Sequence, residues 1–350
     1  MVMYSSFRPG ETWLDTEGKP IQAHGGYMYY ENNTYYWIGE NKEYTDGING
    51  IWHNGVRCYS SQDLYNWKDD GIIISAVQDE DSTLNSKSCM DRPHILYNQK
   101  TGRYVCYLKI MEKDGSQSMT ILTAERLLGP YEIVKEHFHP YGMNCGDFDL
   151  AVDEEGNGYW YFERVHSDLI CADLSDNFLD VKDSYSVHFP HPEGVPYVRE
   201  APAHFTRNGI HYLITSGTSG YYPNPSETAS ADDYHGPFTV LGSPHVNDDS
   251  NTSFHSQISC VFKVQNKKDL YIAMADRWLV DAMHIPYENV RDVFHLDHLG
   301  KTEEALSIMK SLDLPKENTS KAAYVWLPVI FEKGRPKIFW HDEWKIEDYN

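Results

Sequence analysis

The feature of this sequence that most constrains its fold is a strand–turn–strand pattern that occurs five times. The copies span residues 25–39, 94–108, 149–162, 203–214 and 259–273. Each copy has an apolar or aromatic strand on either side of a turn that carries Gly or Asn, the residues that tolerate positive φ. The copies recur about every 50 to 70 residues, a period that suits a four-stranded blade. The sequence therefore predicts an all-β, five-bladed β-propeller, in preference to a β-sandwich with the same spacing by chance.

The segment 279–323 interrupts this pattern before the last strands. Residues 302–312 have the character of a short helix, with Thr302 placed to cap it and two glutamates in its first turn. Residues 324–331 and 336–340 then resume the strand pattern. We expect a short helical insertion in the last blade, and we expect residues 1–350 to form a single catalytic domain because no linker divides them.

Charge and composition exclude some partners. The chain has 52 acidic and 30 basic residues, for a net charge of -22. Such a surface repels phosphate backbones and anionic lipid, so we expect no nucleic-acid or membrane partner and favour a neutral substrate such as a carbohydrate. Aromatic residues make up 14% of the chain, which suits strands and also suits stacking on sugar rings.

Cysteine usage and the first residues bear on localisation. The six cysteines are scattered, and most lie in apolar strand-like runs, which argues against a disulfide framework. The first residues lack a charged segment followed by an apolar one, so no secretory signal is predicted. We expect a cytoplasmic protein from the sequence as written, or a secreted one if a leader has been removed. The sequence does not set the oligomeric state.

Four segments resemble glycoside hydrolase family 43. They are residues 59–68, 91–98, 147–156 and 199–203. The resemblance implies a five-bladed propeller with an active site on its central axis and hydrolysis of glycosidic bonds with inversion. It also implies substrates such as arabinans, xylans and galactans, cut mostly from their ends. Residues 15–26, 256–259, 275–278 and 324–328 most resemble the exo-β-1,3-galactanase branch, which favours release of terminal galactose.

Inverting hydrolysis needs one group that protonates the leaving oxygen and another that activates water on the opposite face of the sugar. Glu200, at the start of a predicted innermost strand, is the candidate general acid. Desolvation and a neighbouring carboxylate near the axis would raise its pKa from the usual ~4.3. Asp147 matches the family residue that tunes and orients this acid.

The water-activating group is left open. The family usually has an Asp before its first hairpin, but residues 22–26 contain no carboxylate. Gln257 and Asp91 are the preferred candidates, and Glu40 is a third. An amide holds water by hydrogen bonds but is not an ordinary base. A salt bridge is the competing interpretation of Asp91.

Sugar contacts are expected from side chains near the axis or its rim. The candidates are His24, Glu40, Tyr221, Tyr222, Arg277, Trp278 and Trp326. The scattered histidines lack metal-ligand spacing, so no protein metal site is predicted. No cofactor is expected to be required, although the resemblance allows a structural calcium ion in the channel.

Two other classes of function remain compatible with the sequence. Within the family, the alternatives are an α-L-arabinofuranosidase, a β-xylosidase or a galactofuranosidase. Outside catalysis, a sugar-binding propeller is compatible with the missing first-blade Asp. A propeller that binds proteins on its rim predicts no carboxylates at the axis.

Overall fold

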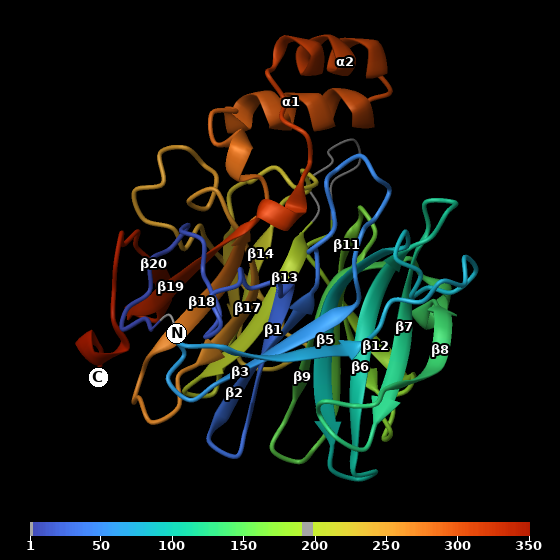
Figure 1. Cartoon of the computed structure of the whole chain (residues 1–350), viewed down its shortest axis with the longest axis vertical. Helices are drawn as coiled ribbons and strands as arrows, with labels where there is room; N and C mark the ends of the chain where they lie inside the picture. Colours follow the sequence, from blue (N-terminus) through green and yellow to red (C-terminus); the bar gives the residue numbers. More distant parts are fainter. Residues whose placement is uncertain (1–2, 191–198) are drawn as a thin grey trace.

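The computed structural model describes residues 3–190 and 199–350 and shows five four-stranded antiparallel sheets (Figure 1). We call these sheets blades 1–5. Blade 1 contains β1 (His24–Glu31), β2 (Thr34–Glu40), β3 (Val56–Ser61) and β4 (Lys68–Ile74), and blade 2 contains β5 (Cys89–Asn98), β6 (Arg103–Met111), β7 (Gln117–Ala124) and β8 (Glu132–Phe138). Blade 3 contains β9 (Cys145–Val152), β10 (Gly158–Arg164), β11 (Asp168–Leu174) and β12 (Val181–His188). Blade 4 contains β13 (Glu200–Arg207), β14 (Ile210–Ser216), β15 (Glu227–Ala231) and β16 (Thr239–Gly242), and blade 5 contains β17 (Gln257–Lys263), β18 (Tyr271–Arg277), β19 (Ala323–Glu332) and β20 (Arg335–Ile338).

The five blades form a closed ring, with the first strand of each blade nearest the central axis. In each blade the strands pair in chain order. The first strands contact one another in the cycle β1, β5, β9, β13, β17 and back to β1. This arrangement is a five-bladed β-propeller, as the sequence predicts, and each predicted hairpin forms the first two strands of one blade.

The helical insertion lies between the second and third strands of blade 5. It contains α1 (Tyr287–His298) and α2 (Thr302–Ser311), which pack against each other beyond one end of the strands (Figure 1). Short 3-10 helices lie at Pro140–Gly142, Val280–Ala282, Thr319–Lys321 and Ile346–Asp348. Within the described residues, no helix is both long enough and apolar enough to cross a membrane.

Most of the tryptophans are part of the core. Trp37 and Trp67 of blade 1 and Trp326 of blade 5 are fully buried and contact one another. Phe7 stacks on Trp344 at 4.3 Å between ring centroids, which ties the amino-terminal segment to the end of the chain. The aromatic content therefore stabilises the seam between the first and last blades, because buried rings contribute large apolar area and favourable edge contacts.

Candidate active site

Each blade places one cross-strand pair of side chains at the same end of its first hairpin. One member lies at or within two residues of the start of the inner strand, and the other lies at or within two residues of the end of the second strand. In chain order the pairs are His24–Glu40, Asp91–Lys109, Asp147–Glu163, Glu200–Ser216 and Gln257–Asp276. Asp147 and Glu163 fall in the irregular stretch between the pairs Phe148–Phe162 and Cys145–Arg164, and the other four pairs are in direct register.

Every one of these hairpins has a shift of strand register next to its pair. In three blades the residue after the inner member has positive φ, namely Gly25 (53°), Arg92 (53°) and Ala201 (46°). A bulge bends the strand and changes the direction of nearby side chains. The local backbone therefore turns the polar end of each hairpin toward the axis while the rest of the strand keeps its apolar packing.

Each pair contributes at least one side chain to a cavity of about 260 Å3 on the side of the propeller covered by α1. This volume is near the lower end of the ~300–1,000 Å3 typical of small-molecule sites. The lining residues are Glu40, Trp52, Asp91, Arg92, Lys109, Met111, Gln117, Asp147, Glu163, His166, Glu200, Thr218, Gly220, Tyr221, Gln257, Trp278 and Phe294. Five of the predicted acid, water-activating and tuning residues are among them: Glu40, Asp91, Asp147, Glu200 and Gln257.

Glu200 has the environment of an acid that keeps its proton. Burial is the largest factor that raises the pKa of its carboxyl well above the usual value, and the charges of Glu163 and Asp147 raise it further. Lys109 and Arg92 act in the opposite direction. Glu200 is partly buried. A partly desolvated carboxyl beside two other carboxylates can remain protonated near neutral pH, which is the state that a general acid requires.

Asp147 and its neighbours form a buried ionic network. Its Oδ1 lies 2.9 Å from Arg92 Nε and 3.4 Å from Lys109 Nζ. Burial would raise the pKa of Asp147, but these two cations outweigh it and hold the pKa below its usual value. Asp147 is therefore ionised, with its charge largely compensated.

Asp91 is also ionised, although it is buried. Trp52 Nε1 donates to its Oδ1 at 2.8 Å, and Lys109 Nζ lies 3.1 Å from its Oδ2. Despite burial, Lys109, Lys42 and the indole hydrogen bond lower its pKa. The salt bridge expected as the competing interpretation does exist, but with Lys109. It leaves a charged carboxylate that lines the cavity.

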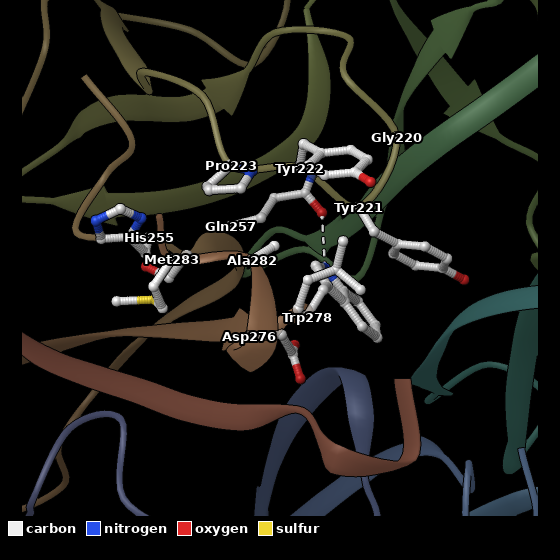
Figure 2. A pocket seen from close by; sticks show the side chains of 12 residues that line it. Gly220, Tyr221, Tyr222, Pro223, His255, Gln257, Asp276, Trp278, Ala282 and Met283 are labelled. Carbon is white, nitrogen blue, oxygen red and sulfur yellow. Dashed lines mark hydrogen bonds between the residues drawn. The ribbon is translucent and has the colours of Figure 1, made fainter. Parts of the chain in front are cut away.

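Gln257 is held by hydrogen bonds on both sides of its amide. Its Oε1 accepts from Arg92 Nη2 at 2.7 Å and from Trp278 Nε1 at 3.3 Å, and its Nε2 donates to Ser216 Oγ at 2.9 Å. Figure 2 shows the amide oxygen joined to the Trp278 indole, with Tyr221 beside them. Because a carbonyl oxygen has two lone pairs, Oε1 is already saturated, and the second N–H is the group left for substrate or water.

Glu40 is the carboxyl that blade 1 contributes to the cavity. Its Oε1 accepts from Arg92 N at 2.9 Å, and its Oε2 lies 2.8 Å from Lys42 Nζ. Burial raises the pKa of Glu40 to about 7, and the charge of Lys42 opposes this shift. Blade 1 thus has no carboxylate at the start of its inner strand, and the acidic group that it contributes to the cavity comes from the second strand.

The predicted sugar contacts divide into two groups. Tyr221 and Trp278 line the cavity, and their rings lie 5.2 Å apart. Tyr222 lines the small adjoining pocket drawn in Figure 2.

Three predicted contacts do not line the cavity. His24 is fully buried, paired with Asp276 at 3.1 Å and stacked on Tyr324. Trp326 belongs to the core at the blade 1–blade 5 seam. Arg277 donates to backbone carbonyls of residues 254 and 255. The structure therefore places these three side chains away from the cavity, since a residue's position along the strand does not determine which way its side chain points.

Several cavity residues escaped the sequence analysis. Lys109 and Glu163 lie within two residues of the ends of the second strands of blades 2 and 3, close to the position that Glu40 occupies in blade 1. Aligning the five hairpins by their second strands would have found both. Trp52 and His166 lie outside the predicted hairpins, and no signal in the sequence pattern indicates them.

One group of residues in the described ranges has the spacing to share a cation. Ligand atoms of Glu163, His166 and Glu200 all lie within 4.8 Å of one another. Calcium takes six to eight oxygen ligands, so two carboxylates and an imidazole do not fit it. We therefore derive no chemical step through an ion at this site.

A scan against family models matches residues 20–275 to "Glycosyl hydrolases family 43". The chain belongs to glycosyl hydrolase family 43. Enzymes of this family generally need no cofactor. The cavity lies within blades that this match covers, except for Trp278 and Phe294, which follow it.

The family 43 chain is similar to proteins of related activities. A curated relative, xylosidase/arabinosidase 43B of Humicola insolens, is 24% identical over 200 residues, which cover 54% of this chain and 36% of the relative. The chain thus spans little more than a third of that relative's length. Among solved structures, a family 43 β-1,3-galactosidase is 28% identical with a TM-score of 0.79, covering 98% of this chain and 64% of the other. The exo-β-1,3-galactanase of Clostridium thermocellum is 26% identical with a TM-score of 0.76, covering 97% and 66%.

Proposed function

We propose that this chain is an exo-acting, inverting glycoside hydrolase that releases terminal galactose from β-1,3-linked galactose chains. The observation that carries the proposal is the contrast between two carboxyls in one small cavity. The surroundings of Glu200 raise the pKa of its carboxyl and favour the protonated form, whereas the surroundings of Asp91 lower the pKa of its carboxyl and favour the ionised form. Hydrolysis with inversion needs one protonated and one ionised carboxyl.

In the proposed reaction Glu200 gives its proton to the glycosidic oxygen as the bond from that oxygen to the anomeric carbon breaks. Asp91 accepts a proton from water while the water oxygen bonds to the anomeric carbon on the opposite face. We favour Asp91 over Gln257 for this role because the Gln257 carbonyl oxygen already accepts two hydrogen bonds. The free N–H of Gln257 is suited to orient the water or a sugar hydroxyl.

The choice of galactose and of the chain end rests on two kinds of support. The two solved structures described above are each more than 25% identical to this chain and are named as a β-1,3-galactosidase and an exo-β-1,3-galactanase. Tyr221, Trp278 and Phe294 crowd one side of the cavity with aromatic rings. A small cavity walled in this way suits the end of a chain better than its middle.

The test compares Glu200→Gln with the wild type on two substrates. On β-1,3-galactobiose, a poor leaving group needs the acid, so we expect a loss of about 10²- to 10⁴-fold in kcat/KM. On 2,4-dinitrophenyl β-galactoside, whose leaving group needs no proton, we expect a much smaller loss. Equal losses on both substrates would remove Glu200 from the role of acid. Proton NMR of the first product should show α-galactose, the inverted anomer.

The curated relative's name favours a second candidate, an arabinofuranosidase or xylosidase. Assays with an aryl α-L-arabinofuranoside and an aryl β-xyloside, beside the galactoside, distinguish a pentosidase from a galactosidase. Hydrolysis of either in preference to the galactoside would select the pentosidase. A wild type that binds galactobiose and hydrolyses none of the three would select the sugar-binding propeller.

A further inference from the structure

The carboxylate expected to tune the acid is not the one best placed to do so in this chain. Asp147 shares a buried network with Arg92 and Lys109, at 2.9 Å and 3.4 Å. All three side chains are nearly inaccessible to solvent. The positive charges of Arg92 and Lys109 therefore offset the negative charge of Asp147. Asp147 is thus a weak source of negative potential at Glu200.

Glu163 is a second carboxylate beside Glu200, and its surroundings differ. It is the penultimate residue of β10 and is 2% exposed, and it belongs to the group whose ligand atoms are within 4.8 Å of one another. Its Oε1 accepts from the backbone N of His166 at 2.7 Å and faces His166 Nδ1 at 3.0 Å. Within the described part of the chain, its ion-pair partner is this histidine, whose charge depends on pH.

The Glu163 carboxylate packs closely against the backbone of Gly146. A Cβ on Gly146 would meet Glu163 Oε2 at 2.4 Å, so the carboxylate occupies the space that any larger residue there would fill. The His166 ring, in contrast, is about half exposed. The pair thus joins a fixed buried carboxylate to an imidazole in contact with solvent.

We propose that the Glu163–His166 pair keeps Glu200 protonated, with the Glu163 carboxylate as the main source of negative potential and His166 as its pH-dependent counter-charge. This inference rests on the proposed role of Glu200 as the general acid. Glu163 and His166 are positioning residues, since they act through Glu200. The charged groups that face Glu200 are Glu163 and Asp147, which favour its proton, and Lys109 and Arg92, which oppose it.

The sign of the effect follows from the charges. While His166 is neutral, the Glu163 charge is uncompensated and the proton on Glu200 is held firmly. The hydrogen bond to Glu163 raises the pKa of His166. Below that pKa the imidazolium offsets Glu163. Removing the Glu163 charge should lower the pKa of Glu200, so the acid loses its proton at a lower pH and the alkaline limb of the rate profile moves toward acid.

The experiment measures the protonation of Glu200 directly. Enzyme labelled with 13C at the glutamate carboxyls is titrated by NMR, and the resonance missing from Glu200→Gln identifies Glu200. We expect Glu163→Gln to lower the pKa of Glu200 by about one pH unit or more. The alkaline limb of kcat/KM should shift by the same amount, so that activity at pH values on this limb falls about tenfold. Glu155→Gln, an equal charge change at the exposed opposite end of the same hairpin, should shift neither.

Two further variants separate this role from a structural one. Glu163→Asp keeps the charge and should restore most of the wild-type profile, and His166→Asn should leave the alkaline limb in place or move it to higher pH. A Glu163→Gln enzyme that is slower at every pH with the Glu200 resonance unmoved would overturn the proposal. A Glu155→Gln variant that shifts the Glu200 resonance as far as Glu163→Gln does would also overturn it. If Glu163→Gln fails to fold, a Glu163→Asp enzyme that loses the raised pKa of Glu200 although it keeps the charge would do the same. Because the titration needs no turnover, an enzyme that hydrolyses nothing would refute the proposed function and still test this one.

Discussion

At the scale of the residue, function in this chain depends on backbone that ordinary side chains avoid. Gly25, Arg92 and Ala201 have positive φ, and each follows a side chain at the axial end of its blade. Left-handed backbone costs non-glycine residues roughly 1–2 kcal/mol. Arg92 and Ala201 adopt it where the register shifts turn Asp91 and Glu200 toward the cavity, which is strain retained at a functional site.

Gly25 shows how narrow the tolerance is. A Cβ there would stand 2.3 Å from Glu40 Oε1, the atom that accepts from Arg92 N. We expect Gly25→Ala to destabilise the protein by more than the ~1–2 kcal/mol of the backbone alone, because the hydrogen bond is displaced as well. Thermal unfolding measures this. Gly71→Ala is the matched control, since φ is +91° there and nothing lies within 4 Å. Equal losses in melting temperature would contradict the explanation.

At the scale of the element, the helical insertion is the part that sequence patterns describe least well. The structure confirms the expected helix as α2, but Lys301 occupies the cap position and Thr302 makes no capping bond. α1 was not predicted, because its apolar positions are few and two histidines and three acidic residues interrupt them. Yet α1 supplies Phe294 to the cavity. An element with weak local preference is here held by packing against Trp278 and its neighbours.

Phe294 should therefore affect substrate binding more than folding. We expect Phe294→Ala to raise KM for galactobiose about three- to tenfold, on the order of 1 kcal/mol of lost aromatic contact, with a smaller change in kcat. Leu306→Ala, at an exposed position of α2, is the control and should leave KM unchanged. Steady-state kinetics of both variants decides the matter. A wild-type KM in the phenylalanine variant would place the helix outside the binding site.

At the scale of the whole molecule, the closed ring brings together charges that lie far apart in the sequence. The inner strands contact one another around the cycle, so residues from blades 1 to 5 share one cavity. Burial there raises the pKa of Glu200 well above normal. In the unfolded chain this carboxyl ionises near its usual pKa of ~4.3. Above that pH the folded state therefore holds a proton that the unfolded state has lost, and stability falls as pH rises until Glu200 ionises in the folded state.

Glu200→Gln removes this cost. We expect its melting temperature to match that of the wild type near pH 4 and to exceed it increasingly toward pH 7. Each pH unit between the two pKa values corresponds to about 1.4 kcal/mol. Calorimetry at several pH values measures the difference, with Glu155→Gln as the control. A constant difference at all pH values would mean that the substitution acts through packing rather than through protonation.

Sequence alone was enough for the architecture and for placing the candidate acid, Glu200, in the cavity. Five hairpins with Gly or Asn turns specify strands locally, and their even spacing indicates five blades, because alternation and turn chemistry act over a few residues. The resemblance to family 43, together with the hairpin pattern, singled out Asp91, Asp147, Glu200 and Gln257, and the structure brings these four into one cavity.

Only the tertiary structure decided how these groups are charged and which side chains face the cavity. Lys109 compensates both Asp91 and Asp147, Glu163 approaches Glu200 from another blade, and His24 turns into the core to meet Asp276. Each of these facts depends on which strands become neighbours and on how a bulge aims a side chain. Protonation follows burial and charges only a few ångströms away, and those distances exist only once the ring has closed.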